Sequence, residues 1–560
     1  MTLTCLPFLS DKNIARLFFG LAVLYLIVGL SAVIAWSPLV PFADAWRHYA
    51  QLVDVPFPAS VFGLDNGHPE IFANLVRWIS LIWLRGDERF QSIIGLLLAL
   101  ATLGVFLRVA WLARGIAVPA RAAAMFALVL GIFWLGNARG LLHDNEALHA
   151  YSVLLCLALA LSLCGNAIDG SIATGRIVGA TLLCTAASFN FGSGVASFVA
   201  LTTLLSLQRV SLKRFLIPAA GLAITLVAYS LLGDHAGGVA GSDLQLVART
   251  SVLLRWLAAP VMYLFWPFVD PSAAASLPHP LDRIGCFAHA WTMLFGDMHR
   301  SVVPQVALGF ALLGVLGLAI WRARRRAETT NAVARLGLSL AAFGVGVGVL
   351  VAAARLSYFA EFPTQIYAPR YLPWSSLAWA GLLTAYAAGA YSRLKTVVMA
   401  TVAVLALGAE GGMSLVMLHE RQDANDTALA AVVGVWPDGK TASENNPDDV
   451  RSGAAALRRI GAGPFAWPES ELLGRELPAN AHSLLVRWTD DVQTSDSTGS
   501  VAVRLQAVVS GKRCDEERLW VVEHGRVAGL LRNVGGEQWR GAARTESVDT
   551  PLEVWEPGCE

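Results

Sequence analysis

The segment Ile14–Trp36 reads IARLFFGLAVLYLIVGLSAVIAW and contains one charged residue, Arg16. A helix rises about 1.5 Å per residue, so roughly 20 mostly apolar residues cross the hydrocarbon core of a bilayer. This segment is long enough to do so. Because its apolar run is longer than the roughly 7–15 residues typical of a signal peptide, we expect a retained membrane anchor.

The rest of the chain repeats this pattern. Hydrophobic residues make up 55% of the 560 residues and charged residues 15%, with a mean hydropathy of +0.55. That composition is too apolar for a soluble protein of this length, so we predict an α-helical polytopic membrane protein with about eleven transmembrane helices. The predicted spans are Ile14–Trp36, Phe90–Ala113, Ala120–Leu135, Ala147–Leu163, Ile177–Phe189, Gly192–Leu207, Phe215–Leu232, Val303–Trp321, Leu336–Ala354, Leu372–Tyr391 and Val397–Leu418.

The positions of Lys and Arg predict the orientation, because these residues accumulate in cytoplasmic loops. With the amino terminus inside, every basic cluster between spans falls inside. The segment Ser251–Phe268 carries Arg255, Pro260 and Pro267, and we predict a helix lying in the membrane interface. A twelfth crossing there would place the basic run after Trp321 outside.

The longer polar loops then lie outside, together with the carboxy terminus. They cover residues 37–89, 136–146, 233–304 and 355–371. No phosphate-cradling Gly-rich motif is present, and no basic patch interleaved with aromatic residues indicates nucleic-acid binding. We therefore expect any chemistry to be extracytoplasmic and independent of a bound nucleotide.

The tail is predicted to be a second domain. Residues 1–418 form the membrane domain, and residues 419–560 form a small extracytoplasmic α+β or β-rich domain, because charged, Pro- and Gly-rich sequence begins at His419. Asp448–Ile460 has the pattern of an amphipathic helix. Cys514 and Cys559 are candidates for a disulfide, although the connectivity stays open. Short β-like patterns follow the helix at Ser483–Trp488, Ser500–Leu505, Arg518–Val522 and Leu552–Trp555.

The first outside loop contains two polar groups. Asp44 follows the first span and precedes Trp46, Arg47 and His48, a mixture suited to a polar ligand at the level of the headgroups. A carboxylate there can take a proton from a hydroxyl. The alternative for Asp44 is an ion pair with Arg47, or solvation.

The second group in this loop is Asp65-Asn66-Gly67-His68-Pro69-Glu70. Asn-Gly predicts a turn, Pro69 suits the first turn of a helix, and Glu70 complements a helix amino terminus. Local structure therefore accounts for four of these residues, whereas Asp65 and His68 stay as candidate ligands.

The next outside loop carries His143, Asp144, Asn145 and Glu146. Carboxylates from two outside loops can meet to bind a divalent cation or to orient sugar hydroxyls. Asp144 or Asn145 also makes a good N-cap for the following span, so His143 and Glu146 are the stronger candidates.

Arginines in an outside loop depart from the accumulation of Lys and Arg on the cytoplasmic side. We therefore predict an anionic partner, such as a lipid phosphate, for Arg355 and for Arg370 with its neighbour Tyr371. The alternative is snorkelling to ordinary headgroups. The turn Ser188–Gly194 favours close helix packing, and Asn190 is its candidate ligand.

These motifs together resemble the bacterial GT-C membrane glycosyltransferases. The similarity lies in Asp44 after the first span, His68-Pro69-Glu70, the Ser188–Gly194 turn and Arg370-Tyr371 before a late span. Some uncharacterised multi-span members carry a second motif like Gln-His-Asn-Glu-His-Arg. In this chain Asn66 and His68 fit that motif, whereas Gly67 and Pro69 depart from it.

The resemblance implies transfer of a sugar, hexosyl or pentosyl, from a polyprenyl-phosphate donor to an envelope glycan, lipid or protein outside the bacterial inner membrane. Asp44 would be the general base, and some members use a divalent cation (Mg²⁺ or Mn²⁺). Mapped onto this chain, Arg355, Arg370 and Tyr371 would bind the donor phosphate; Trp46, Arg47, His48, Asp65, His68, Glu70, His143, Glu146 and Asn190 the sugar or acceptor; and Asp44, Asp144 and Glu146 the cation.

Two other hypotheses belong to different classes. A transporter or flippase for lipid-linked saccharides would place ionisable groups at mid-span, where this chain has few beyond Arg108 and Glu410. A non-catalytic scaffold for envelope assembly would leave Asp44 dispensable.

Overall fold

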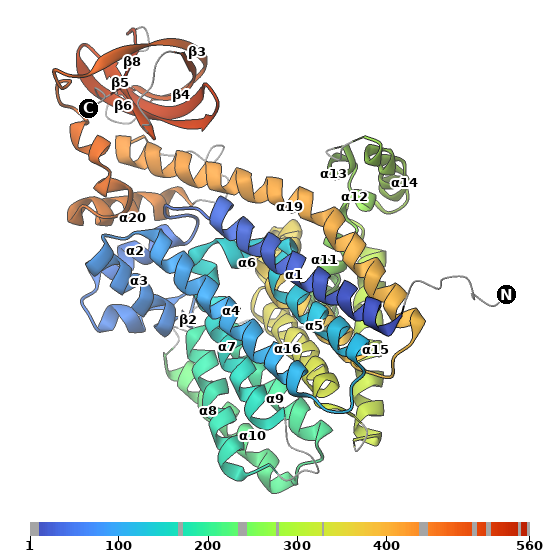
Figure 1. Cartoon of the computed structure of the whole chain (residues 1–560). Helices are drawn as coiled ribbons and strands as arrows, with labels where there is room; N and C mark the ends of the chain where they lie inside the picture. The colour runs from blue at the N-terminus through green and yellow to red at the C-terminus, as the bar shows by residue number, and fades with distance from the viewer. Residues whose placement is uncertain are drawn as a thin grey trace. The chain divides into compact units, whose positions relative to one another are not determined.

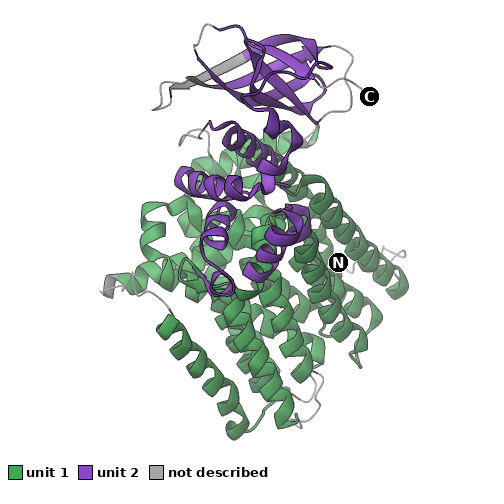
Figure 2. Cartoon of the chain, turned by 90° about the vertical axis from the view of Figure 1, so that its left-hand side faces the viewer, with its two compact units in different colours: residues 1–37, 64–73, 92–417 green, residues 38–63, 74–91, 418–560 purple. Residues whose placement is uncertain are grey.

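The computed structural model describes residues 10–165, 172–232, 243–275, 279–327, 330–435, 446–495, 501–510, 517–546 and 550–556. The chain forms two compact units, distinguished by colour in Figure 2. Unit 1 comprises Met1–Ser37, Leu64–Ala73 and Ser92–Met417, and unit 2 comprises Pro38–Gly63, Asn74–Gln91 and Leu418–Glu560. Both Cys514 and Cys559 lie outside the described residues, so their pairing stays a prediction.

Unit 1 is a helical bundle (Figure 1). The hairpin strands β1 (Leu64–Asp65) and β2 (His68–Pro69) also belong to it. Its helices are α1 (Asp11–Trp36), α5 (Val118–Phe133), α6 (Ala138–Leu142), α7 (Asp144–Gly165), α8 (Thr174–Asn190), α9 (Ala196–Leu207), α10 (Leu212–Leu232), α11 (Asp243–Leu264), α12 (Trp266–Val269), α13 (Pro271–Ala275), α14 (Gly285–Phe295), α15 (Val302–Arg325), α16 (Ala332–Ala354), α17 (Leu356–Glu361), α18 (Leu372–Ala387), and most of α4 (Glu88–Leu112) and α19 (Arg393–Val433).

The eleven predicted spans all fall on helices. Among the described residues, eight helices are long and apolar enough to cross a membrane, in agreement with the predicted polytopic α-helical class. The other three predicted spans correspond to α8, α9 and α18, which have 17, 12 and 16 residues. These helices end where the backbone leaves the helical conformation. For example, α8 stops at Asn190 because Phe191 adopts an extended backbone.

The segment Ser251–Phe268 falls on α11 and α12. The middle of α11 is buried all round, over residues 256–260, and the helix packs against α15, α16 and α18. The segment is therefore part of the bundle, and its position in the membrane interface stays a prediction.

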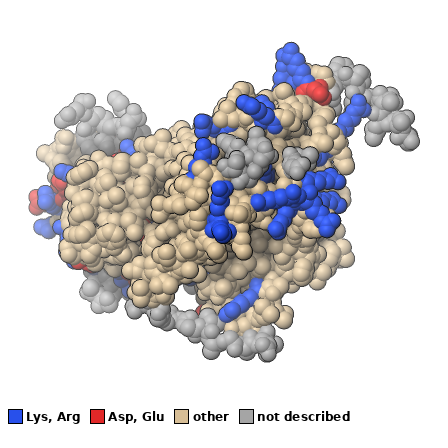
Figure 3. Space-filling view, turned by 90° about the horizontal axis from the view of Figure 1, so that it is seen from below, with Lys and Arg blue, Asp and Glu red and all other residues tan. Residues whose placement is uncertain are grey.

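The predicted cytoplasmic loops meet one another. The Arg209 guanidinium donates to the carbonyl oxygen of Arg324 at 2.9 Å, and the Arg214 guanidinium donates to that of Ile172 at 3.0 Å. Figure 3 shows Lys and Arg side chains gathered on one face of the molecule, with few acidic side chains beside them. These contacts bring the loops around Ile172, Arg209 and Arg324 together, and their side of the membrane stays a prediction.

Unit 2 combines helices and a β-barrel. Its helices are α2 (Ala45–Asp54), most of α3 (Ile71–Leu84) and α20 (Pro447–Ile460). Trp46 and Tyr49 of α2 and Val450 and Leu457 of α20 lie in one hydrophobic core. Two segments from the first polar loop are therefore built into the same unit as the tail.

The predicted helix over Asp448–Ile460 is confirmed, with one correction. Its buried residues include Val450, Ala454 and Leu457, whereas Ile460, expected on the same side, is 46% exposed. The physical reason is the end of the helix: Gly461 adopts a left-handed conformation directly after Ile460, so the last turn extends past the core.

The β-barrel is closed and has the strand order β3-β4-β7-β6-β5-β8, all antiparallel. The four predicted β patterns fall on β3, β4, β5 and β8, apart from Leu552, which precedes β8, and Ser500, which lies outside the described residues. The sequence patterns missed β6 and β7, because glycine and alanine are poor strand formers. The strands are β3 (His482–Ser495), β4 (Val501–Ser510), β5 (Arg518–Glu523), β6 (Arg526–Gly535), β7 (Gln538–Thr545) and β8 (Glu553–Glu556).

Candidate functional site

The β1–β2 hairpin positions the second polar group of the first loop. Asn66 and Gly67 have φ values of 48° and 76°, as a two-residue hairpin turn requires, so the predicted turn is confirmed. The turn places Asp65 directly across from His68. Pro69 lies in β2, and α3 begins after Glu70, so the prediction of Pro69 inside the first helical turn was wrong. The pairing of the two hairpin strands fixes the position of Pro69, in spite of the preference of proline for the first turn of a helix.

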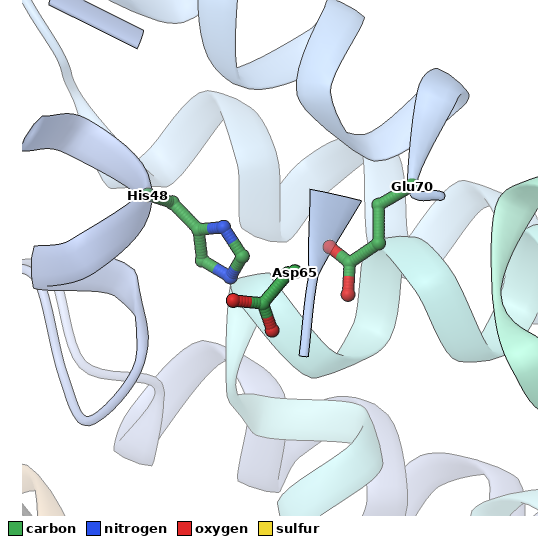
Figure 4. A group of neighbouring side chains, drawn as sticks. All are labelled: His48, Asp65 and Glu70. Atoms are coloured by element: carbon green, nitrogen blue, oxygen red, sulfur yellow. The ribbon is translucent and has the colours of Figure 1, made fainter. Parts of the chain in front are cut away.

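Two carboxylates gather beside this hairpin. Asp65 is 8% exposed and Glu70 is 1% exposed, and a carboxylate oxygen of one lies within 4.8 Å of an oxygen of the other. Figure 4 shows both side chains pointing into the same space; His48, also drawn there, belongs to unit 2. The Nδ1 atom of His149, on α7, lies 3.7 Å from Oε1 of Glu70. Such a group can accept hydrogen bonds from neighbouring hydroxyls of one ligand.

Aromatic rings pack beside the hairpin and His149. The imidazole of His149 is stacked on Phe191, with centroids 4.1 Å apart and planes 10° apart. The His68 ring lies 5.5 Å from the same phenyl ring, and Trp374 of α18 lies parallel to it at 6.2 Å. Phe191 therefore joins the hairpin to α7 and α18.

Gly192 permits the close approach of His68. A Cβ atom at position 192 would lie 2.6 Å from Nδ1 of His68, closer than real Cβ contacts, and Nδ1 is buried without a hydrogen-bond partner among the described residues. The predicted packing role of the Ser188–Gly194 turn is confirmed at this glycine.

We expect Gly192→Ala to destabilise the protein by about 1–3 kcal/mol, because the added methyl group must displace the His68 ring. Thermal unfolding in detergent measures the effect. The matched control is Gly175→Ala in α8, where a Cβ atom would meet nothing within 4 Å. Equal stability of the two variants would contradict the packing argument.

The start of α7 supplies further polar groups. Nε of Arg139 donates to Oε1 of Glu146 at 2.7 Å, and the Arg139 side chain is buried. The predicted N-cap role of Asp144 or Asn145 was wrong, because α7 begins at Asp144 and the carbonyl oxygen of His143 accepts the first helical N–H, from Ala147. Oδ1 of Asp144 accepts the backbone N–H of Asn145, whereas Oδ2 is buried without a hydrogen-bond partner among the described residues. His143 is buried beside them at 3% exposure. Because Arg139 already balances Glu146, a cation at Asp144 and Glu146 would meet a buried like charge, and we derive no step through a metal ion there.

Arg355 and Arg370 share one tyrosine. Each guanidinium carbon lies 5.9 Å from the centroid of Tyr358, and Arg370 also lies over the Tyr371 ring at 5.2 Å. Nη2 of Arg370 donates to Tyr358 and to Gln365, at 2.9 and 2.8 Å. Within the described part of the chain, neither arginine has a carboxylate at ion-pair distance. Two oriented cations without an acidic partner form an anion-binding arrangement.

His68 of the hairpin is coupled electrostatically to Arg355. Burial lowers the pKa of His68, the positive charge of Arg355 lowers it further, and Asp65 opposes both effects in part. His68 therefore stays neutral near pH 7, and its imidazole can both donate and accept a hydrogen bond.

The lowered pKa of His68 predicts a pH-dependent stability. The unfolded chain, with an ordinary histidine pKa of about 6.5, takes up this proton more readily than the folded chain, so stability falls as the pH drops below about 6.5. We expect His68→Gln to reduce the difference between the melting temperatures measured at pH ~7.5 and ~5.5. His279→Gln, at a 71% exposed side chain, is the control. An unchanged pH dependence in His68→Gln would contradict the assignment.

The remaining predicted residues of the first loop lie in unit 2. Asp44 precedes α2, its side chain is 55% exposed, and its Oδ1 lies 3.4 Å from Nη1 of Arg47. Arg47 also pairs with Asp449 at 3.1 Å. Trp46 is fully buried in the core and His48 is 2% exposed, so packing accounts for the indole. Of these four, Asp44 is the most open to a ligand.

The sequence patterns did not identify His149 and Trp374 as residues of this region. His143, Glu146 and His149 are spaced by three, which puts them near one face of a helix, and this spacing could have identified His149. Trp374 carries no such signal, because it lies in an apolar span. Asn190, a predicted ligand, is half-buried at the end of α8.

Comparisons with known proteins give two structural likenesses. No protein-family model and no curated protein sequence matches the chain. ArnT from Cupriavidus metallidurans bound to undecaprenyl phosphate is 17% identical, with a TM-score of 0.35 over 78% of this chain and 88% of that chain. The oligosaccharyltransferase of Archaeoglobus fulgidus in the apo form is 14% identical, with a TM-score of 0.34 over 79% of this chain and 60% of that one. At these TM-scores the likenesses carry no argument about this chain.

Proposed function

We propose that this protein is a membrane glycosyltransferase that moves a hexose or pentose from a polyprenyl-phosphate donor to an envelope glycan, lipid or protein. The observation that carries the proposal is the set of charged groups that act on His68 in unit 1. Asp65 lies across the hairpin from His68, and the charges of both Asp65 and Arg355 act on the His68 imidazole. A sugar joined to a phosphate needs hydroxyl acceptors and a cation near each other.

The donor phosphate is assigned to Arg355 and Arg370. Guanidinium groups bind phosphate oxygens with two parallel hydrogen bonds, and their charge stabilises the phosphate that departs when the sugar is transferred. Tyr371 and Tyr358 hold the Arg370 guanidinium over their rings. This preorganisation supports a role in the transition state as well as in binding.

The sugar is assigned to the polar groups around the hairpin and the start of α7. Asp65 and Glu70 accept hydrogen bonds from hydroxyls, and the stacked pair of His149 and Phe191 offers an apolar surface beside them. His68, His143, Glu146 and Asn190 complete the proposed contacts.

Asp44 is the proposed general base. In the transfer step the acceptor oxygen bonds to the anomeric carbon while the bond from that carbon to the phosphate oxygen breaks. The acceptor proton passes to the Asp44 carboxylate, and the polyprenyl phosphate leaves. The assignment rests on the position of Asp44 after the first span and on its exposure within unit 2. Arg47 orients the carboxylate, whereas the fully buried Trp46 packs in the core of unit 2 and His48 is only 2% exposed.

The compartment is part of the same proposal. We place the protein in the bacterial inner membrane with the amino terminus inside and the tail outside, because the basic loops that meet in unit 1 are then cytoplasmic. The carboxylates of the hairpin and the two arginines then face the extracytoplasmic side, where a polyprenyl-linked sugar is available in the outer leaflet.

The transporter hypothesis is less well supported. Glu410 is its clearest mid-helix carboxylate, and Oε1 of this residue accepts the backbone N–H of Leu135 at 3.3 Å, where the chain between α5 and α6 leaves the helix. Glu410 thus satisfies a backbone N–H group inside the bilayer, which is a structural role and does not require a transported ligand.

The direct test is reconstitution of the full chain into liposomes with polyprenyl-phosphate sugars and an envelope extract. We expect one labelled sugar to move to an acceptor, and the corresponding sugar to disappear from envelope glycans of cells that lack the protein. Movement of the intact lipid-linked sugar across the bilayer without transfer would instead support the flippase.

A further inference from the structure

The helix α14 of unit 1 carries an apolar side that no described residue covers. Met293 is 88% exposed, Leu294 is 75% exposed and Phe287 is 63% exposed. Phe287 and Leu294 are seven residues apart and Met293 adjoins Leu294, so the three side chains share one side of the helix. Large apolar side chains that are grouped and exposed mark a surface that contacts a partner or a lipid phase.

The opposite side of α14 is fixed to the rest of unit 1. The helix packs against α12 and α13, and Figure 1 shows the three helices in one group. Ala288 is fully buried, and Trp291 packs against the main hydrophobic core of the bundle. Between α12 and α13, Asp270 accepts the indole N–H of Trp266 and the backbone N–H of Ser272, each at 2.9 Å. Because α14 is held on this side, its apolar side faces away from the bundle.

The composition of α14 suits an apolar environment. Residues 284–295 include no Asp, Glu, Lys or Arg. The hydroxyl and imidazole side chains of the helix reach its own backbone. The Thr292 hydroxyl donates to the carbonyl oxygen of Ala288 at 2.8 Å. Nδ1 of His289 lies 2.7 Å from the carbonyl oxygen of Gly285. Polar groups that are satisfied within their own helix lower the cost of removing that helix from water.

The apolar side of α14 adjoins a predicted membrane span. The helix ends at Phe295, and α15, which is long and apolar enough to cross a membrane, begins at Val302. Val303, in the first turn of α15, is 74% exposed, so both helices expose apolar side chains close to the turn that joins them. With 11 residues α14 is roughly 17 Å long, too short to cross about 30 Å of hydrocarbon. An apolar helix of this length beside a span can lie along the interface.

We infer that α14 lies in the membrane interface and inserts its apolar side, formed by Phe287, Met293 and Leu294, among lipid acyl chains beside α15. Each of these side chains gains the free energy of leaving water when it contacts hydrocarbon. The continuity with α15 favours lipid over a second copy of the chain as the partner. Insertion fixes the depth at which the segment between α11 and α15 meets the bilayer. The inference does not depend on the proposed sugar transfer.

Photocrosslinking to lipid tests the inference. The full chain is reconstituted into phosphatidylcholine liposomes that contain a phospholipid with a diazirine on its acyl chain, illuminated and digested with trypsin. Because Arg283 and Arg300 bracket α14, one tryptic peptide, residues 284–300, reports on the helix. We expect a yield of lipid adducts on this peptide at least about ten-fold above that on residues 452–458 of α20, in the predicted extracytoplasmic tail. Residues 301–322 of α15 are the positive control.

Two paired variants separate insertion from folding. Met293→Glu/Leu294→Glu is expected to lower the adduct yield at least about five-fold, because a carboxylate is costly in hydrocarbon. Met293→Ala/Leu294→Ala is the matched control and should keep a yield near that of the wild type, since alanine is apolar. Both side chains are exposed, so neither pair of substitutions removes packing within unit 1.

Three results would overturn the inference. The first is an adduct yield on residues 284–300 no higher than that on residues 452–458. The second is an equal loss of adducts in the glutamate and alanine pairs. The third concerns a second copy of the chain, tested with a bifunctional thiol reagent on the exposed Cys286 in the same liposomes. If the reagent joins two chains at Cys286 while lipid adducts on α14 are missing, a second copy covers this side instead.

Discussion

Asp44→Asn is expected to lower the rate of sugar transfer by about 10²–10⁴-fold, because the amide cannot take the proton of the acceptor hydroxyl. The loss should lie in kcat, since asparagine keeps the shape and the hydrogen-bonding capacity of the side chain. Arg47 keeps its second partner, Asp449, so α2 should stay in place. Initial rates with a polyprenyl-phosphate sugar in proteoliposomes measure the effect.

The chain offers a close control for this variant. Asp54 lies at the other end of α2, is 56% exposed and pairs with an arginine, Arg459, as Asp44 pairs with Arg47. Asp54→Asn should keep the wild-type rate. Full activity of Asp44→Asn would refute the general-base assignment, and equal losses in both variants would mean that the carboxylates act on the fold of unit 2.

The double variant Arg355→Gln/Arg370→Gln is expected to lower kcat/KM for the donor by at least about 100-fold. Loss of one preorganised donor at a developing charge commonly costs 10²–10³-fold, and these two cations have no acidic partner among the described residues that would otherwise explain them. Arg370→Lys alone should keep only part of the rate, because lysine lacks the planar guanidinium that lies over the Tyr358 and Tyr371 rings.

The control for the arginine pair is Arg283→Gln, an exposed arginine of the same unit in a predicted outside loop. It should leave kcat/KM unchanged. If the double variant binds and transfers like the wild type, the arginines serve only as headgroup anchors. The snorkelling alternative would then be correct.

Much of unit 1 follows from local sequence. Each predicted span became a helix because length and apolarity are properties of a continuous segment. The Asn66-Gly67 turn was predictable for the same reason, since its positive φ angles depend on two adjacent residues. The Gly- and Ala-rich strands β6 and β7 were not, because pairing in the barrel forms them.

The candidate site was predictable in part. His68, Glu70 and Glu146 are polar residues in otherwise apolar surroundings, and that contrast can be read from sequence. The Glu70–His149 contact and the stack of His149 on Phe191 depend on how helices far apart in the chain pack together. Nothing adjacent in sequence indicates them.

The sequence by itself determined that the protein is helical, that it is suited to a membrane, and that its basic and acidic loops alternate. Tertiary structure alone decided which polar groups meet and that residues 38–63 and 74–91 fold with the tail in one unit. It also decided that Arg421, Arg518 and Arg532 share a cavity. The physical reason is range: hydropathy and turn geometry act over a few neighbouring residues, whereas these contacts join segments tens to hundreds of residues apart and form only when the cores pack.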